Sequence, residues 1–245
     1  MKQYIISIFI ILSLFSGSCK KENLCDCFKG TGSVTSETRA LPDFSNVYAE
    51  DNVNVIFIED TFSSVEVEAG ENLLKLIKTE VADGWLKIRN DNKCNFVRRY
   101  DIPVNVIIHY KRNTIYHIKS KCTGTLYNQG VSTSDSLDLD VESSGDIRFS
   151  VASGKIFTHQ HGTGDVELKG QCNDVIIYSI GTGFTLADEC LANYVWVYTN
   201  TTGKITVHTS GILDAEIDGS GNVYYKGTPT QIFRKLHGTG QVLPY

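Results

Sequence analysis

Carboxylates are numerous among the groups in this sequence that could do chemistry, and the chain has 28 of them. A polysaccharide lyase needs several acids that converge on calcium beside a basic catalyst, and a glycosidase needs two acids across one cleft. Those in the second half of the chain include Asp138, Asp140, Glu142, Asp146, Asp165, Glu167, Asp188, Glu189, Asp214, Glu216 and Asp218. Asp146 and Asp165 each follow a glycine, but Phe184 and Lys204 stand at the next two such positions. We therefore expect turn carboxylates and assign no catalytic residue.

Histidine and cysteine, the usual ligands of transition metals, show no metal-site spacing in the sequence. His159 and His161 lie on the outward side of one expected strand, whereas His208 and His237 belong to other segments. Cys25-Asp26-Cys27 has no second ligand pair at zinc-like spacing and no histidine near it in the sequence. We expect no metal and no cofactor.

A short motif ending in Ser-Gly or Thr-Gly, which we call the marker, repeats along the second half of the chain. The elements between its copies carry the acids and histidines described above. Its copies are Cys122-Thr123-Gly124, Ser143-Ser144-Gly145, Gly162-Thr163-Gly164, Gly181-Thr182-Gly183, Thr201-Thr202-Gly203, Gly219-Ser220-Gly221 and Gly238-Thr239-Gly240. The spacing is 18 to 21 residues. A period near twenty is typical of a solenoid, in which each repeat buries its apolar face against its neighbours.

Side chains around each marker alternate with the period of a β-strand. The second residue after the glycine is usually apolar, as in Ile147 and Val166, and a second apolar run precedes the next marker, as in residues 175–178. Helical spacing is absent from this region. The pattern predicts an all-β fold, a parallel β-helix-like solenoid with coils of about 19–20 residues. The marker glycines would sit at one corner, where a positive φ or close backbone approach favours glycine.

One outward column of the expected solenoid could bind a ligand. Five residues before each marker glycine the chain has Lys119, Asp140, His159, Tyr178, Tyr198, Glu216 and Lys235. Stacked Tyr178 and Tyr198, flanked by His159 and Glu216, could hold a sugar ring on their faces and bond its hydroxyls. The alternative is an aromatic ladder that only stabilises the sheet, by about 0.2–1 kcal/mol for each pair.

The N-terminus has the pattern of a secretory signal peptide over residues 1–18. Lys2 is followed by the apolar run Ile5 to Phe15 and by Ser16-Gly17-Ser18, directly before Cys19. Small residues before a cysteine resemble the bacterial lipobox, although Ser16 stands where that motif usually has an apolar residue. The resemblance implies that Cys19 is lipidated and that residues 19–29 tether the protein to a membrane. An ordinary signal peptide followed by an unmodified cysteine is the alternative.

The segment after Cys19 and the overall charge bear on location and partners. Lys20-Lys21-Glu22-Asn23 is partly similar to the signal that exports Bacteroidetes lipoproteins to the cell surface, and we leave open which side of the outer membrane the protein occupies.

The 23 basic and 28 acidic side chains of the protein give a formal net charge of −5, and loss of Lys2 with the signal peptide makes the charge one unit more negative. Without a basic cluster we expect no nucleic-acid partner.

Six cysteines remain beside Cys19, an even number that suits an oxidising compartment. Cys172 lies eight residues after Gly164, and Cys190 lies seven after Gly183. Stacked coils would place these two cysteines nearly one above the other, so we expect a disulfide between them. The pairing of Cys25, Cys27, Cys94 and Cys122 stays open.

Motifs upstream of the repeats occur in an order that resembles a known family. They are R-x-L-x-x-F-x-x-V from Arg39, V-x-V from Val53, V-x-V-x-A-x-x-x-L-L from Val65 and T-x-V-x-D-G-x-L-x-I from Thr79. With the glycine repeats, from about Thr31 to the C-terminus, they resemble the head GIN domain of putative auto-transporter adhesins, secreted or lipidated proteins common in Bacteroidetes. The resemblance implies a right-handed β-helix-like fold and a role in adhesion, and it brings no catalytic residues.

We expect residues 30–245 to form a single GIN-type domain, with regular coils over 121–245. Between Asp51 and Gly124 the marker is missing, so residues 30–120 should form a less regular β portion with hairpins that caps the solenoid. Where relatives have Gly-Ser-Gly, this chain has Asp51-Asn52, residues that tolerate a left-handed corner.

These patterns favour a non-catalytic cell-envelope lipoprotein that presents a β-helix surface to a glycan or protein ligand. The alternative is a carbohydrate-active enzyme, a polysaccharide lyase or hydrolase, on the same scaffold. Asp135-Ser136-Leu137 resembles an O-glycosylation signal of Bacteroidetes. Glycosylation of Ser136, the identity of the ligand and the oligomeric state stay open.

Overall fold

The computed structural model describes residues 30–92 and 102–245. The expected signal peptide, the lipid site Cys19, the tether and cysteines 25, 27 and 94 lie outside these residues. No helix in the described part of the chain is long and apolar enough to span a membrane.

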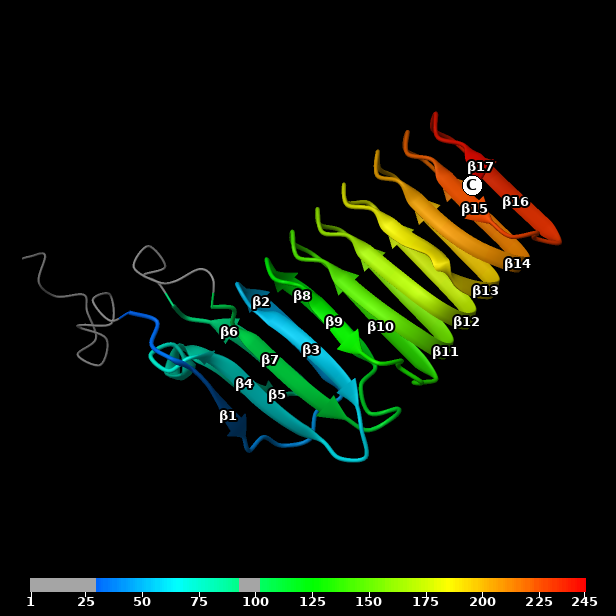
Figure 1. The fold of residues 1–245 in the computed structure, drawn as a ribbon. Coiled ribbons are helices and arrows are strands. Elements are labelled where there is room, and N and C mark those ends of the chain that lie inside the picture. Colours follow the sequence, from blue (N-terminus) through cyan, green and yellow to red (C-terminus); the bar gives the residue numbers. More distant parts are fainter. Residues whose placement is uncertain (1–29, 93–101) are drawn as a thin grey trace, which may run out of the picture.

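About seven turns of a β-solenoid occupy residues 117–244 and confirm the predicted fold class (Figure 1). Pairing between turns is parallel, with offsets mostly of 18 to 21 residues: Leu126 pairs with Ile147, Ile147 with Val166, and Ile205 with Val223. The strands are β8 (His117–Cys122), β9 (Leu126–Gln129), β10 (Ser136–Val141), β11 (Ile147–Gln160), β12 (Val166–Ser179), β13 (Thr185–Thr199), β14 (Ile205–Ile217), β15 (Val223–Lys226), β16 (Gln231–Leu236) and β17 (Val242–Pro244).

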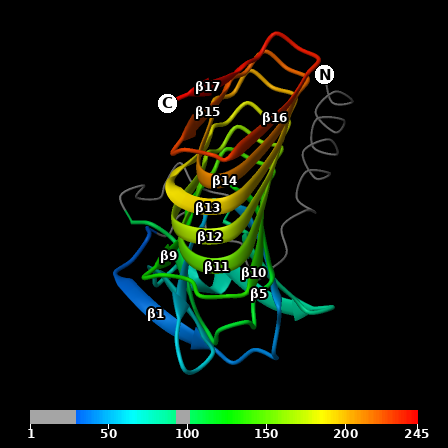
Figure 2. The ribbon, with the colours of Figure 1, turned by 90° about the vertical axis from the view of Figure 1, so that its right-hand side faces the viewer.

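Each turn contributes one strand segment to each of two sheets around a shared core. The first sheet contains β8, β10, the C-terminal halves of β11 to β14, and β16. The second sheet contains β9, the N-terminal halves of β11 to β14, β15 and β17. Because β11 to β14 bend from the second sheet into the first, as Figure 2 shows, the sheets belong to one hydrogen-bonded network.

The marker glycines are required by close approach between coils. A Cβ on Gly164 would lie 2.1 Å from the carbonyl oxygen of Gly145, and one on Gly183 would lie 2.1 Å from that of Gly164. No marker glycine in the described solenoid has a positive φ. Close approach of the backbone, and not a positive φ, is therefore the reason for glycine at these corners. Asp51 takes the expected left-handed corner, with φ 67°.

The N-terminal part is a mixed sheet, as predicted. Its elements are β1 (Val34–Arg39), β2 (Asn46–Asp51), β3 (Asn54–Glu59), β4 (Ser64–Gly70), the short 3-10 helix η3 (Leu74–Leu76), β5 (Ile77–Ala82), β6 (Trp85–Asn90) and β7 (Asn105–Tyr110). β4 runs antiparallel to both β1 and β7, and β5 forms a hairpin with β6. These strands lie at one end of the stack, and β16 and β17 lie at the other (Figure 1).

Strands β2 and β3 form a further coil that the sequence did not predict. β2 is parallel to β8, and β3 is parallel to β9, although these pairs are about seventy residues apart in the chain. Phe57 of β3 is fully buried, and its ring lies 6.4 Å from that of Tyr110 and 5.5 Å from that of Phe149. The N-terminal part and the solenoid therefore share one apolar core.

Candidate ligand-binding face

The register places the residues of the predicted column side by side on the first sheet. His159 pairs with Tyr178, Tyr178 with Tyr198, and Tyr198 with Glu216. All four side chains are half-buried, between apolar positions that point into the core, such as Ile177. The column therefore exists on the outer face as predicted, and its role in binding a ligand stays a prediction.

The two tyrosines of this column form a stacked aromatic pair. Their ring centroids lie 5.1 Å apart with an interplanar angle of 14°. The ring of His159 lies 6.1 Å from that of Tyr178, at 43°. This stacked pair presents its ring edges and its outer ring faces to the surroundings, where the apolar face of a sugar ring could pack while its hydroxyls bond to nearby polar groups.

Sequence reasoning missed a second aromatic column, two residues earlier in the same strands. Phe157 pairs with Ile176, and Ile176 with Trp196. The ring of Trp196 lies 6.5 Å from that of Tyr198, at 17°. The same alternation that predicts the first column also predicts the second. We name the surface formed by both columns the aromatic face: Phe157, His159, Ile176, Tyr178, Trp196 and Tyr198.

A chain of polar contacts borders the aromatic face at its C-terminal end. The hydroxyl of Tyr198 donates to Asp218 Oδ2 at 2.9 Å, and His237 Nδ1 lies 2.7 Å from Asp218 Oδ1. The hydrogen bonds from His237 and then Tyr198 lower the pKa of Asp218, and the bond to Asp218 is the main reason that the pKa of Tyr198 is raised. Tyr198 therefore stays a neutral hydroxyl at physiological pH.

His237 contacts the carboxylate of Asp218, whereas the sequence pattern placed the histidines in separate positions with no common partner. Asp218 and His237 each stand three residues before a marker glycine, Gly221 and Gly240, so the repeat alignment already carried this signal. Lys235 Nζ also lies 3.4 Å from Glu216 Oε2, in the next position of the predicted column.

At the other end of the aromatic face, Asp138 is partly withdrawn from water. Its Oδ1 lies 3.4 Å from Nε2 of His159. Burial raises the pKa of Asp138, and the nearby histidines His159 and His117 oppose that shift. The acid thus supplies a polar border to the rings on the N-terminal side.

The acids that follow marker glycines have a structural role at the corners. Asp146 Oδ1 accepts the backbone N–H of Asp165 at 3.0 Å, and Asp165 Oδ1 accepts that of Phe184 at 2.7 Å. Each carboxylate therefore holds the next coil in register, which explains their position without catalysis.

The predicted disulfide between Cys172 and Cys190 is absent from the structure, in which both are buried free thiols. An extra residue in β13 shifts the register, so that Cys172 pairs with Ala192 and Cys190 pairs with Gly170. With strands about 4.8 Å apart and about 3.3 Å of rise per residue, this stagger separates the Cα atoms by about 8 Å. A disulfide needs less than about 7 Å.

Burial also makes these thiols unreactive. Desolvation, followed by the proximity of Cys172, raises the pKa of Cys190 to about 12. Burial raises the pKa of Cys172 and of Cys122 as well. Protonated thiols are weak nucleophiles, so none of the three is a candidate catalytic residue.

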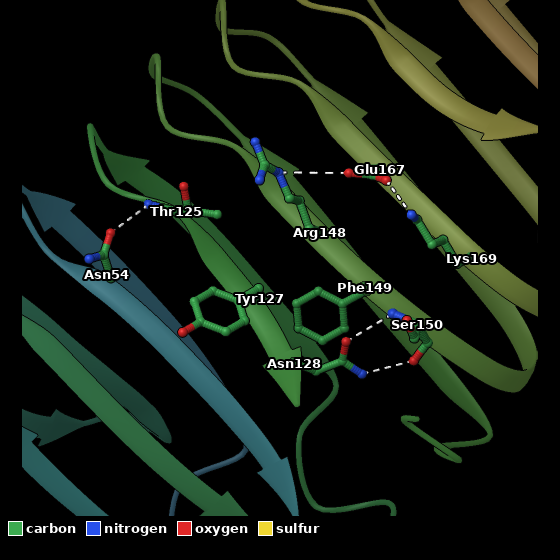
Figure 3. Close-up of a pocket in the computed structure, with 9 residues that line it drawn as sticks. All are labelled: Asn54, Thr125, Tyr127, Asn128, Arg148, Phe149, Ser150, Glu167 and Lys169. Carbon is green, nitrogen blue, oxygen red and sulfur yellow. Dashed lines mark hydrogen bonds and ion pairs between the residues drawn. The ribbon is translucent and has the colours of Figure 1, made fainter. Parts of the chain in front are cut away.

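A shallow pocket of about 520 Å³ lies on the outer side of the second sheet, away from the aromatic face (Figure 3). It is lined by Asn54, Thr125, Tyr127, Asn128, Arg148, Phe149, Ser150, Glu167 and Lys169. Tyr127, Arg148 and Glu167 each stand three residues after a marker glycine and pair in adjacent strands. The repeat alignment therefore contained this column too, but its residue types gave no chemical signal.

Polar groups in this pocket are already bonded to one another. Glu167 is its one lining carboxylate and lies 2.9 Å from Lys169 Nζ and 3.7 Å from Arg148 Nε (Figure 3). Asn128 accepts the N–H of Ser150 and donates to its carbonyl oxygen, both at 2.8 Å. The pocket thus lacks the acid pair that glycoside hydrolysis requires.

Comparison with solved structures shows the same fold in proteins from Bacteroides and Parabacteroides species. A putative adhesin from Bacteroides fragilis is 23% identical, with a TM-score of 0.78, over 89% of this chain and 100% of that chain. A putative adhesin from Parabacteroides merdae is 17% identical, with a TM-score of 0.68, over 88% and 98%. A putative lipid binding protein from Parabacteroides distasonis is 19% identical, with a TM-score of 0.65, over 89% and 99%. None of these three structures has an enzyme's name.

No curated protein matches the sequence. A family model described as "Putative auto-transporter adhesin, head GIN domain" matches residues 43–229. This span begins just before β2 and extends past β15, so it contains the whole aromatic face and most of the solenoid. The chain belongs to the head GIN domain family of auto-transporter adhesins.

Proposed function

We propose that this protein is a non-catalytic lipoprotein of the cell envelope that binds a glycan through its aromatic face. The observation that carries the proposal is the parallel pair Tyr178 and Tyr198, with ring centroids 5.1 Å apart on the outer side of the first sheet. Membership of an adhesin family supports a role at the cell surface.

The chemistry of the aromatic face favours a sugar as the ligand. Trp196 adds a third ring, nearly parallel to that of Tyr198, and rings of this kind present a large apolar area with few rotatable bonds. Carboxylates and imidazoles at both ends, Glu216 and His159 among them, supply acceptors and donors for hydroxyl groups. If the protein bound no glycan in a screen, a protein ligand would be the alternative.

Replacing both Tyr178 and Tyr198 by serine should weaken glycan binding about tenfold or more. Two lost ring contacts cost about 1–3 kcal/mol of binding free energy. The free energy of unfolding should fall by only about 1 kcal/mol or less, because the pair packs on the surface. A glycan array identifies the ligand, calorimetry measures the affinity, and thermal unfolding measures the stability.

The matched control replaces Tyr127 and Tyr224 on the second sheet by serine and should leave binding unchanged. Equal binding by the wild type and the Tyr178/Tyr198 variant would eliminate the aromatic face. Loss of folding in that variant would show that the pair is a structural ladder. Release of reducing sugar from a bound glycan would instead favour the enzyme alternative.

The second part of the proposal is a lipid anchor on Cys19. Its basis is the signal-like sequence that ends in Ser16-Gly17-Ser18 directly before this cysteine. A lipidated N-terminus would hold the domain at the outer membrane without a membrane-spanning helix. The tether would then present the solenoid to the surroundings.

Changing Cys19 to alanine should abolish lipid labelling and release the protein from the membrane fraction. Metabolic labelling with radioactive palmitate, followed by fractionation, measures both effects, and Cys25→Ala is the matched control that should keep the label. Palmitate that still enters the Cys19 variant would exclude this residue as the lipid site. Antibody labelling of intact cells would then decide on which side of the outer membrane the domain lies.

A further inference from the structure

We propose a site for a divalent transition metal of the Zn²⁺ class at Glu216, Asp218 and His237. One carboxylate oxygen of each acid and one ring nitrogen of the histidine all lie within 4.8 Å of one another. The site borders the aromatic face at its C-terminal end, but the inference does not depend on what that face binds.

Stacking of the coils fixes the backbone of this site. Glu216 lies near the end of β14 and Asp218 directly follows the strand, so their side chains leave the chain on the same side. His237 follows β16 in the next coil, and its N–H donates to the carbonyl oxygen of Ile217 at 2.9 Å. The N–H of Gly238 donates to the same oxygen at 3.0 Å. The three side chains therefore start from a rigid frame.

The donor set suits zinc better than magnesium or calcium. Two carboxylate oxygens and one imidazole nitrogen match the three-ligand sites that zinc uses when it keeps a fourth position for water or a ligand. Magnesium and calcium prefer sites made only of oxygen. Metal–ligand bonds of about 2.0–2.2 Å need the donor atoms to close in slightly. Partly exposed side chains can do so: Glu216, Asp218 and His237 are 27%, 31% and 61% exposed.

A neighbouring hydroxyl orients one of the proposed ligands, Asp218. Tyr198 donates to Oδ2 of Asp218 at 2.9 Å and leaves Oδ1, the atom that faces His237, for the metal. Such an outer contact orients a ligating carboxylate.

Replacing Lys235 tests the metal site by an expected gain of affinity, which a misfolded protein would not show. Its ammonium lies 3.4 Å from Glu216 Oε2, where it supplies a positive charge that a metal ion would replace. If the three residues are only a network of hydrogen bonds and ion pairs, removal of Lys235 leaves an unpaired acid and no metal affinity. If they form a metal site, the same change removes a competing cation and a repulsive charge.

The experiment is a calorimetric titration of the full chain in detergent with Zn²⁺. All proteins also carry Cys25→Ser and Cys27→Ser, which removes two other candidate ligands. We expect one saturable site, at least tenfold weaker binding in His237→Ala and Asp218→Asn, and severalfold tighter binding in Lys235→Met. His208→Ala, which changes a histidine of the second sheet, should bind like the parent. With Cu²⁺ as the probe, electron paramagnetic resonance should show one coordinated imidazole nitrogen, which disappears in His237→Ala.

The proposal is overturned if the parent protein shows no saturable Zn²⁺ binding, or if His237→Ala binds as tightly as the parent. Circular dichroism of each variant verifies that the solenoid is intact, so that a loss of affinity reports on the ligands. Tighter binding by Lys235→Met would be hard to obtain from a damaged fold, and it therefore supports the site independently.

Discussion

Replacing Gly183 by valine should lower the free energy of unfolding by more than about 4 kcal/mol, a range reserved for severe core defects. The first side-chain carbon would lie 2.1 Å from the carbonyl oxygen of Gly164 and 2.5 Å from Nε2 of Gln160. Favourable contacts need about 3.5–4.0 Å, so the two coils would have to separate. Separation breaks the hydrogen bond from the N–H of Thr182 to the carbonyl oxygen of Gly162, which is 3.0 Å long.

For a domain of this size, such a loss lowers the melting temperature by about 8–16 °C or prevents folding. Thermal unfolding followed by circular dichroism measures it. Gly30→Val is the matched control, because a Cβ at Gly30 has nothing within 4 Å and the change should be neutral. A melting temperature for Gly183→Val within 2–3 °C of the control (about 1 kcal/mol) would show that the corner can open without cost.

This glycine also explains why the solenoid could be predicted from the sequence. Every coil passes the preceding one at the same corner, so the backbone requires the same residue there each time, and the period appears directly in the sequence. Strand alternation then fixes which side chains point outward. The column of Tyr178 and Tyr198 follows from these two facts alone.

Features that depend on one coil, or on distant pairing, could not be predicted in this way. The extra residue of β13 between Leu186 and Glu189 leaves the alternation before and after it intact, so nothing in the pattern shows the register shift that separates Cys172 from Cys190. The coil of β2 and β3 pairs with β8 and β9 across about seventy residues. Its place in the stack depends on hydrogen bonds between distant segments, which periodicity does not encode.

The proposed metal site could be predicted from the sequence only in part. The repeat aligns Asp218 with His237 and Glu216 with Lys235, but only the structure shows that the side chains of the two pairs come together. Short polar side chains two residues apart can turn toward or away from each other, and sequence spacing does not decide between these rotamers.

Replacing Phe57 by alanine should destabilise the protein by about 3–5 kcal/mol, the usual cost of removing a buried phenylalanine. The side chain is fully buried, and its ring contacts Tyr110 of β7 and Phe149 of β11, so it joins the N-terminal strands to the first regular coils. In a solenoid each repeat is stabilised mainly by its neighbours. The cavity should therefore weaken the N-terminal end of the stack more than the distant C-terminal coils.

Hydrogen exchange measured by mass spectrometry can separate this local effect from a uniform one. We expect faster exchange in β2, β3 and β7 than in β13 and β14 of the same variant, together with a lower melting temperature. Phe62→Ala is the matched control, because Phe62 is 49% exposed and stacks on His109 at the surface, so its loss should cost at most about 1 kcal/mol. Equal acceleration of exchange along all coils would mean that the solenoid unfolds as one cooperative unit. In that case Phe57 would stabilise the whole domain and not the junction alone.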